Sequence, residues 1–138
     1  MKEYKKLKYK NIIYKIGDTI IVKDSTTSEL ICKLMKIIPK NGNLEKPDWP
    51  MIEVLWYYKK DEIDFVSNHI SKDLQNCIAD NELFETNHRD KIFADCILDH
   101  CRVLSFEQYD GETNLKQTDF YCRSFYDIHK VKIDIEIA

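Results

Sequence analysis

The sequence predicts a mainly β fold with short peripheral helices and long loops. Short apolar runs rich in β-branched and aromatic residues recur along the chain, which is typical of strands. Residues 131–137 alternate strictly between apolar and polar side chains, as a half-buried strand does. With 138 residues, of which 43% are hydrophobic, the chain is long enough to bury the core of one domain.

The expected elements follow from these runs and from the few breaks between them. Strands are expected at residues 19–22, 30–38, 51–58, 82–84, 101–106, 119–125 and 131–137. A short helix is expected over residues 71–78 and a helical turn over 92–98. Residues 16–18 form a turn into the first strand, and the polar segments 24–29 and 39–50 are expected as exposed loops.

The charge of the chain favours a basic partner over DNA as the main ligand. A formal net charge of -3 does not suit neutralisation of phosphates, but it suits a partner such as a histone tail. Residues 1–11 are an exception, which we interpret as a basic extension preceding a single domain at 12–138. That extension is either a solvated chain end or a weak accessory contact for nucleic acid. The N-terminal lysines are Lys2, Lys5, Lys6, Lys8, Lys10 and Lys15.

Several classes of function are disfavoured. No apolar run approaches the length of a membrane span, and the odd number of cysteines indicates reduced, mostly buried thiols in an intracellular protein. Cys96 and Cys101 beside His100 lack the second cysteine pair of a structural zinc site, so we expect no metal and no cofactor. No nucleophile elbow, phosphate loop or paired-carboxylate motif is present, so we expect no catalytic residue and no enzyme.

The run of three aromatic residues that closes the third expected strand is the strongest candidate for a binding site. Strand geometry sends Trp56 and Tyr58 to one face and Tyr57 to the other. Two rings on one face attract cations, and a methylated ammonium group is a natural guest. The alternative is that all three rings belong to the core, where aromatic residues are common.

Five blocks, taken in order, resemble the bromo-adjacent homology (BAH) domain over roughly residues 12–127. Each block is short and weak by itself, whereas their order and spacing together are specific. They are a Gly-Asp turn with its strand at 16–22, a strand at 30–37, Trp-Tyr-Tyr followed by Asp61-Glu62, the long segment 81–103 with His88-Arg89-Asp90, and Phe-Tyr-Cys-Arg with Tyr-Asp at 119–127.

The resemblance implies a distorted β-barrel of BAH type and a non-catalytic module of chromatin proteins. The chain is most similar to a subgroup that reads a trimethyl-lysine of histone H3 written by Polycomb-type enzymes. In that subgroup the cage holds a tyrosine of the second strand together with the tryptophan and second tyrosine of the Trp-Tyr-Tyr run. The histidine and aspartate of a His-x-Asp turn contact the peptide beside the methylated lysine.

Carried over by position, the resemblance makes Trp56, Tyr58 and Leu30 the methyl-lysine cage, and His88 and Asp90 the contacts for the histone peptide. Leu30 departs from the pattern, because it stands where the subgroup has a tyrosine and offers no ring face to a cation. Tyr14 and Phe65 are the aromatic residues available to replace it from neighbouring segments. From spacing alone, a surface turn with local capping is the favoured interpretation of the segment around His88 and Asp90, and the resemblance to the family reverses this preference.

The expected function is therefore that of a nuclear chromatin reader that takes part in transcriptional regulation and gene silencing. Its partner would be a methylated histone H3 tail or a nucleosome. The alternative is a BAH-type protein–protein or nucleosome interaction module with a degenerate cage, which would dock other chromatin subunits without depending on lysine methylation. Leu30 favours this alternative, whereas the combination of Trp56, Tyr58, His88 and Asp90 favours the reader.

Overall fold

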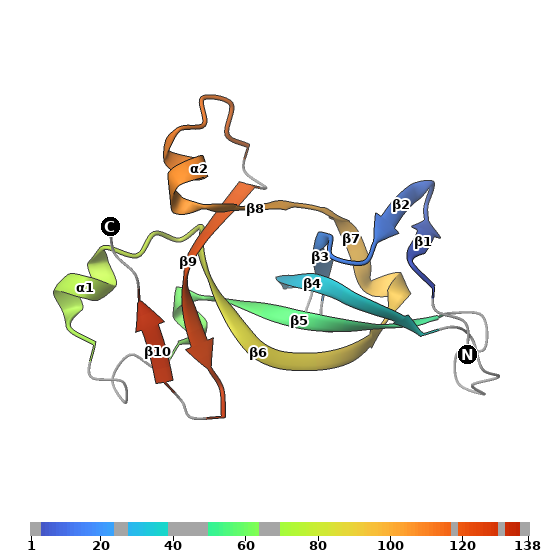
Figure 1. The fold of residues 1–138 in the computed structure, drawn as a ribbon, viewed down its shortest axis with the longest axis horizontal. Helices are drawn as coiled ribbons and strands as arrows, with labels where there is room; N and C mark the ends of the chain where they lie inside the picture. Colours follow the sequence, from blue (N-terminus) through green and yellow to red (C-terminus); the bar gives the residue numbers. More distant parts are fainter. Residues whose placement is uncertain are drawn as a thin grey trace. The chain divides into compact units, whose positions relative to one another are not determined.

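The computed structural model describes residues 4–23, 28–38, 50–63, 70–116, 119–129 and 132–135, the last of these as backbone only. The chain divides into two compact units (Figure 1). The first unit contains Met1–Trp56 and Arg89–His100, and the second contains Tyr57–His88 and Cys101–Ala138. Two strands, β5 (Met51–Lys59) and β6 (Glu82–Phe93), run through both units.

Antiparallel strands build the first unit. β3 (Thr19–Lys23) pairs with β4 (Glu29–Ile38) on one side and with β7 (Ile97–His100) on the other, and β4 pairs in turn with β5. A separate hairpin joins β1 (Lys6–Tyr9) to β2 (Ile12–Lys15). Gly17 follows β2 with a φ of 97°, a left-handed conformation that glycine adopts without steric cost, and so turns the chain into β3.

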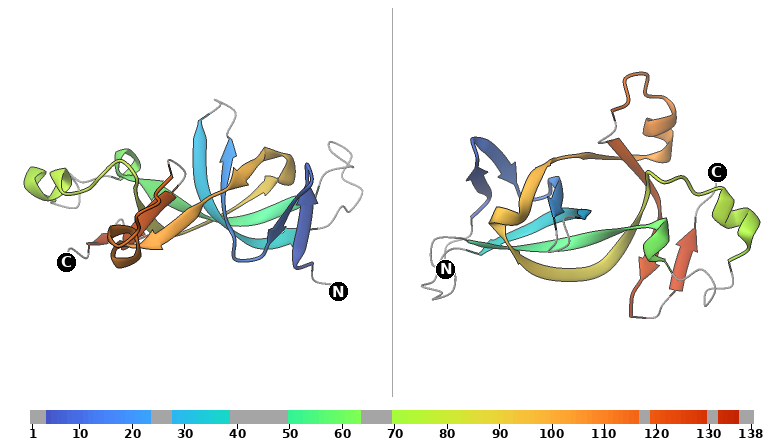
Figure 2. Two further views of the ribbon diagram at one scale, coloured as in Figure 1. Left: turned by 90° about the horizontal axis from the view of Figure 1, so that it is seen from above. Right: turned by 180° about the vertical axis from the view of Figure 1, so that it is seen from behind.

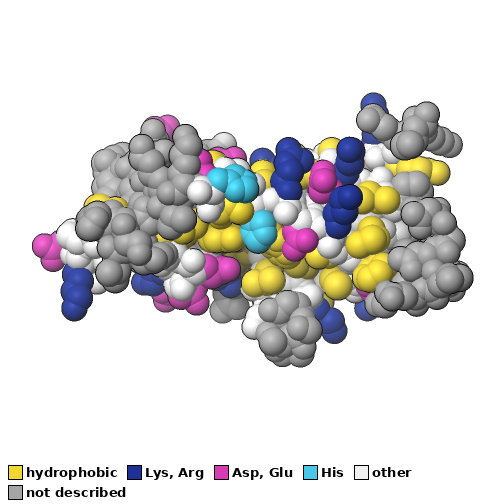
Figure 3. Space-filling model, turned by 90° about the horizontal axis from the view of Figure 1, so that it is seen from below, with side chains coloured by type: hydrophobic (Ala, Val, Ile, Leu, Met, Phe, Trp, Pro, Cys, Tyr) yellow, Lys and Arg dark blue, Asp and Glu magenta, His cyan; other side chains and the backbone are white. Residues whose placement is uncertain are grey.

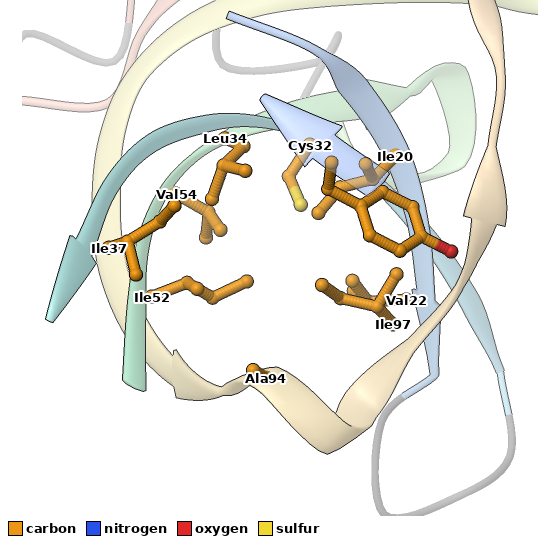
Figure 4. Close-up of a cluster of buried hydrophobic side chains, with 10 residues drawn as sticks. Ile20, Val22, Cys32, Leu34, Ile37, Ile52, Val54, Ala94 and Ile97 are labelled. Atoms are coloured by element: carbon orange, nitrogen blue, oxygen red, sulfur yellow. The ribbon is translucent and has the colours of Figure 1, made fainter. Parts of the chain in front are cut away.

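The core of the first unit lies between these strands and the 3₁₀ turn η2 (Ala94–Cys96). Figure 4 shows the side chains pointing toward one another from β3, β4, β5, η2 and β7. Their aliphatic character explains why the alternating runs form strands here, since every second residue is buried against the same cluster. The buried residues are Tyr14, Ile20, Val22, Cys32, Leu34, Ile37, Ile52, Val54, Ala94 and Ile97.

The second unit is built around β9 (Asp119–Asp127). This strand pairs in parallel with β6 and with β8 (Arg102–Ser105), and antiparallel with β10 (Lys132–Ile135). The unit also contains η1 (Lys60–Glu62), α1 (Lys72–Asn76) and α2 (Phe106–Asp110). Neither described α-helix, each five residues long, has the length or the hydropathy needed to cross a bilayer.

Two ion pairs fasten β9 within the second unit. Glu82 is fully buried, and Arg123 contacts its two carboxylate oxygens at 3.1 and 3.2 Å. Arg102 holds Asp119 through two bonds of 3.0 and 2.7 Å. Both arrangements are bidentate, the strongest geometry for an arginine–carboxylate pair. Glu82 and Arg123 come from the fourth and fifth blocks of the sequence pattern, so these motif residues serve the fold.

Most expected strands are confirmed, with four differences. The helical turn expected over 92–98 is confined to η2 at 94–96, because 92–93 end β6 and 97–98 begin β7. The hairpin β1–β2 includes residues 6–9, within the segment interpreted as a basic extension; where the domain begins stays a prediction. Residues 82–84 begin a strand of 12 residues rather than a short one. α2 occupies part of the expected loop after β8, where Ser105 and Gln108 form a capping box. The expected loop at 39–49 lies outside the described residues.

The cysteines are free thiols, and their burial is mixed. Cys32 and Cys101 are buried, Cys96 and Cys122 are half-buried, and Cys77 is exposed. The expectation of buried thiols is therefore wrong for Cys77, which follows the short helix α1 at the surface rather than lying in an apolar run.

Candidate functional site

The candidate cage residues Trp56 and Tyr58 lie two positions apart near the end of β5. Ile52 and Val54, which precede them on the same face, are fully buried, whereas Trp56 and Tyr58 are only partly buried. The strand thus passes from the core to the surface at the aromatic run. Figure 3 shows one face of the molecule on which histidine, acidic and basic side chains lie among exposed hydrophobic ones.

Trp56 belongs to the first unit, where it contacts both the core cluster and Asp90. The ring packs against the core cluster, and Nε1 donates a hydrogen bond to Oδ2 of Asp90 at 3.3 Å. The other carboxylate oxygen of Asp90 accepts the backbone N–H of Lys91 at 2.8 Å. An exposed carboxylate at the indole edge orients the ring and adds negative potential beside its face, which favours a cationic guest.

Tyr58 belongs to the second unit and is bonded to His88. Its hydroxyl lies 2.7 Å from Nδ1 of His88, and the two rings meet edge to face at a centroid distance of 5.9 Å. The ring of Tyr126 packs against that of Tyr58, with the two ring centroids 5.8 Å apart. Burial, followed by the negative charge of Glu62 and the neighbouring Tyr126, raises the pKa of the Tyr58 phenol. The phenol therefore stays protonated at neutral pH. Its hydroxyl donates a hydrogen bond to Nδ1 of His88 in the tautomer that leaves this nitrogen without a proton.

The segment His88-Arg89-Asp90 is part of strand β6, so the expectation of a turn here is wrong. Extended backbone sends His88 and Asp90 to one face and Arg89 to the other. The backbone N–H of His88 donates to the Thr86 hydroxyl at 3.1 Å, and Arg89 pairs with Glu53 at 3.3 Å within the first unit. Each predicted peptide contact therefore lies against one ring: His88 against Tyr58, and Asp90 against Trp56.

The third predicted cage residue is apolar, and of its two possible aromatic substitutes the structure describes only Tyr14, which is buried. Leu30 is half-buried and packs against the core of the first unit, two positions along β4 from Cys32, which lies opposite Trp56. Tyr14 is 1% exposed and is part of the core, so its ring cannot line an open site. Phe65 lies outside the described residues.

Sequence reasoning missed the partners that position the two rings. Tyr126 backs Tyr58 from β9, and the aromatic Phe-Tyr-Asp end of that strand was its only sequence signal. Asn87, beside His88, donates to Asp127 and accepts the backbone N–H of Ile128, both at 3.0 Å. These two hydrogen bonds connect β6, at the residue before His88, to the end of β9.

The residues weighed as zinc ligands have other roles. Nε2 of His100 lies 3.0 Å from Oδ2 of Asp18, and the imidazole stacks on Tyr14 at a centroid distance of 4.5 Å. Cys96 packs against the core of the first unit. Over the ranges that the structure describes, no group of three or more His, Cys, Asp or Glu side chains could hold a metal ion.

Comparison with known proteins identifies the family. The model of the BAH domain family matches residues 12–133. The chain is 28% identical over 139 residues to origin recognition complex subunit 1 of Schizosaccharomyces pombe, a match that covers 89% of this chain and 18% of that protein. The crystal structure of the yeast Rsc2 BAH domain is similar, with a TM-score of 0.68 and 16% identity over 97% of this chain and 54% of the solved chain.

These comparisons carry different weight. The chain spans under a fifth of the length of the curated relative and about half of the solved chain. At 16% identity the likeness to the Rsc2 domain concerns the fold, and it confirms the expected mainly β fold of BAH type with few short helices. Because the family model matches most of its length, this chain belongs to the BAH domain family, whose members are chromatin-associated modules.

Proposed function

We propose that this domain is a chromatin reader that binds a lysine-methylated histone tail, with the Polycomb-type repressive trimethyl-lysine of histone H3 as its preferred mark. The observation that carries the proposal is the pairing of each candidate ring with a polar residue of β6. Trp56 is oriented by Asp90, and Tyr58 by His88. Both rings stay partly exposed at the strand end, and these bonds fix the orientation in which they could receive a cation.

The chemistry of the guest favours rings over carboxylates as the main contacts. A trimethyl-ammonium group keeps its charge but has no N–H to donate, so it is attracted to ring faces and to nearby negative potential. Asp90 beside Trp56, and Glu62 near Tyr58, supply that potential. In the proposal Leu30 supplies apolar surface, which suits the methyl groups but adds no attraction for the charge.

The affinity must come largely from the peptide around the lysine. A micromolar complex requires about 8 kcal/mol, and each ring contributes roughly 0.5–2 kcal/mol. Two rings therefore supply at most about half of what is needed. In the proposal the tail lies extended, so that its backbone groups form hydrogen bonds while pockets select its side chains. His88 and Asp90, which share a face of β6, are the proposed contacts for this part of the tail.

The remaining attributes follow from this role. BAH domains are non-enzymatic interaction modules, and we propose the same for this chain, with no cofactor. We propose that the protein is nuclear and contributes to gene silencing, with histone H3 tails or nucleosomes as partners. The second candidate is an interaction module that does not depend on methylation, and Leu30 is the observation that favours it.

A methylated-histone peptide array followed by calorimetry tests the proposal. Trp56→Ala should abolish the preference for methylated over unmodified peptide, whereas Trp56→Phe should retain it with binding several-fold weaker, because the ring remains but the bond to Asp90 is lost. Equal binding of methylated and unmodified forms of every tail by the wild-type domain would contradict the proposal.

Leu30→Tyr separates the two candidate functions. If Leu30 borders a cage, a ring at this position adds a third face and should strengthen binding of a trimethyl-lysine peptide by about 2- to 30-fold, the equivalent of one cation–π contact. Binding of the unmodified peptide should not change. An interaction module without a cage would show no methyl-dependent gain from this substitution.

A further inference from the structure

The N-terminal hairpin of the first unit presents two different faces. β1 and β2 are joined by a two-residue turn at Lys10 and Asn11, both with positive φ (51° and 66°), as a type I′ hairpin turn requires. Figure 2 shows the two strands side by side at an edge of this unit. One face is apolar and packs against the core of the unit; its residues are Leu7, Tyr9, Ile12 and Tyr14.

The opposite face is a row of lysines. Lys6 lies directly across from Lys15, and Lys8 lies across from Ile13, whose side chain is 51% exposed. Lys10 continues the row at the tip, where its ammonium group lies 5.4 Å from the centre of the Tyr9 ring. Across the described ranges, none of these lysines forms an ion pair with an acidic side chain.

This arrangement of lysines destabilises the folded hairpin. Like charges directly opposite each other on a sheet face repel, and a lysine in the left-handed region is strained relative to glycine or asparagine. Six lysines and one glutamate give residues 1–15 a formal charge of +5, so the other 123 residues carry -8. Lysines at a sheet edge also discourage edge-to-edge aggregation. The concentration of charge on one face therefore points to an anionic ligand.

We propose that the lysine face of this hairpin (Lys6, Lys8, Lys10 and Lys15) binds the phosphate backbone of duplex DNA. Lys6 and Lys8 are separated by about 7 Å along the strand, which is similar to the spacing of neighbouring phosphates on one DNA strand. Lysine ammonium groups on flexible stems act as point charges toward phosphates, without the fixed fork geometry with which arginine reads a base edge. The contact is consequently independent of sequence.

The composition of this face favours DNA over other anionic partners. Lysine is depleted in the centres of protein–protein interfaces, where arginine and aromatic residues are preferred. A membrane-binding surface would combine its basic residues with several large apolar side chains. Within the row, Ile13 is the one apolar side chain that the structure describes. A face on which ammonium groups outnumber apolar side chains matches a regular array of phosphates best.

The salt dependence of binding to a 20-base-pair duplex of arbitrary sequence tests the proposal by fluorescence anisotropy. Four phosphate contacts predict a slope of about -3.6 in log K against log salt, and hence a loss of about 100-fold between 50 and 200 mM salt. The triple substitution Lys6→Gln, Lys8→Gln and Lys15→Gln should reduce the magnitude of the slope by about 2 to 3. A second duplex of different sequence should bind equally well.

The matched control removes the same charge elsewhere, through Lys23→Gln, Lys36→Gln and Lys72→Gln, all at exposed positions. These changes should alter the slope by less than 1, and thermal melting should show both variants folded. Equal losses in the two triple variants would overturn the proposal, because the effect would then be one of net charge. Binding to phosphatidylserine vesicles without binding to duplex would overturn it as well. A methylated peptide should bind the hairpin variant normally, so this test is independent of the proposed tail site.

Discussion

The bond between Tyr58 and His88 allows a quantitative test of how the candidate site is held. Tyr58→Phe removes the hydroxyl but keeps the ring and its packing against Tyr126. A hydrogen bond of 2.7 Å between two half-buried groups contributes about 1 kcal/mol net, within the usual range of roughly 0.5–1.5 kcal/mol. With a urea m-value of about 2 kcal/mol/M, the unfolding midpoint should fall by roughly 0.5 M.

A double-mutant cycle assigns this loss to the pair. His88→Leu removes the ring nitrogens, and its combination with Tyr58→Phe should show a coupling energy of about 1 kcal/mol. Tyr126→Phe is the matched control, because its hydroxyl makes no hydrogen bond in the part of the chain that the structure describes, and it should cost under about 0.5 kcal/mol. A coupling energy below about 0.3 kcal/mol would refute the view that Tyr58 positions His88.

Three further predictions concern the fold. The Arg102 guanidinium lowers the pKa of Asp119 from 3.8 to about 2, so the carboxylate of the unfolded chain is protonated at a higher pH than that of the folded protein. The free energy of unfolding, measured by urea titration, should therefore decrease as the pH falls from about 4 to 2. Asp119→Asn should remove this part of the pH dependence. Glu82→Ala leaves Arg123 without its buried counter-charge and should cost roughly 3–5 kcal/mol, measured by the urea midpoint. Gly17→Ala meets no atom within 4 Å but places a side chain at a φ of 97°, so calorimetry should show a melting temperature lower by only roughly 3–5 °C.

Strands with an apolar face were predictable from the sequence because burial imposes the alternation. β4 and β5 show this clearly, since Leu34, Ile52 and Val54 are all fully buried. The polar end of β6 was not predictable in the same way. Residues 85–91 contain no apolar side chain, so neighbouring strands rather than local preference determine their extended conformation. The N-terminal hairpin did have a signal: Lys6-Leu7-Lys8-Tyr9 alternates with period two.

The positions of the candidate residues on their strand were predictable, but their contacts were not. The strand period placed Trp56 and Tyr58 on one face, and their partial burial agrees with a strand that leaves the core. The partner of Trp56 lies 34 residues away in sequence and the partner of Tyr58 lies 30 residues away. Such pairings depend on the order of strands in the sheet, including two parallel pairings of β9, and no local pattern encodes that order.

Nucleosome binding would show whether the two proposed surfaces contribute separately. Free energies of independent contacts add, so Trp56→Ala should reduce binding to a methylated nucleosome by the same factor as binding to the methylated peptide. The hairpin substitutions should weaken nucleosome binding without affecting the peptide. If the two surfaces engage one particle at once, the second contact forms at a high effective concentration, and the overall affinity exceeds that of either contact alone. Methylation would then select the nucleosome while the lysine face lengthens the time the domain stays bound to it.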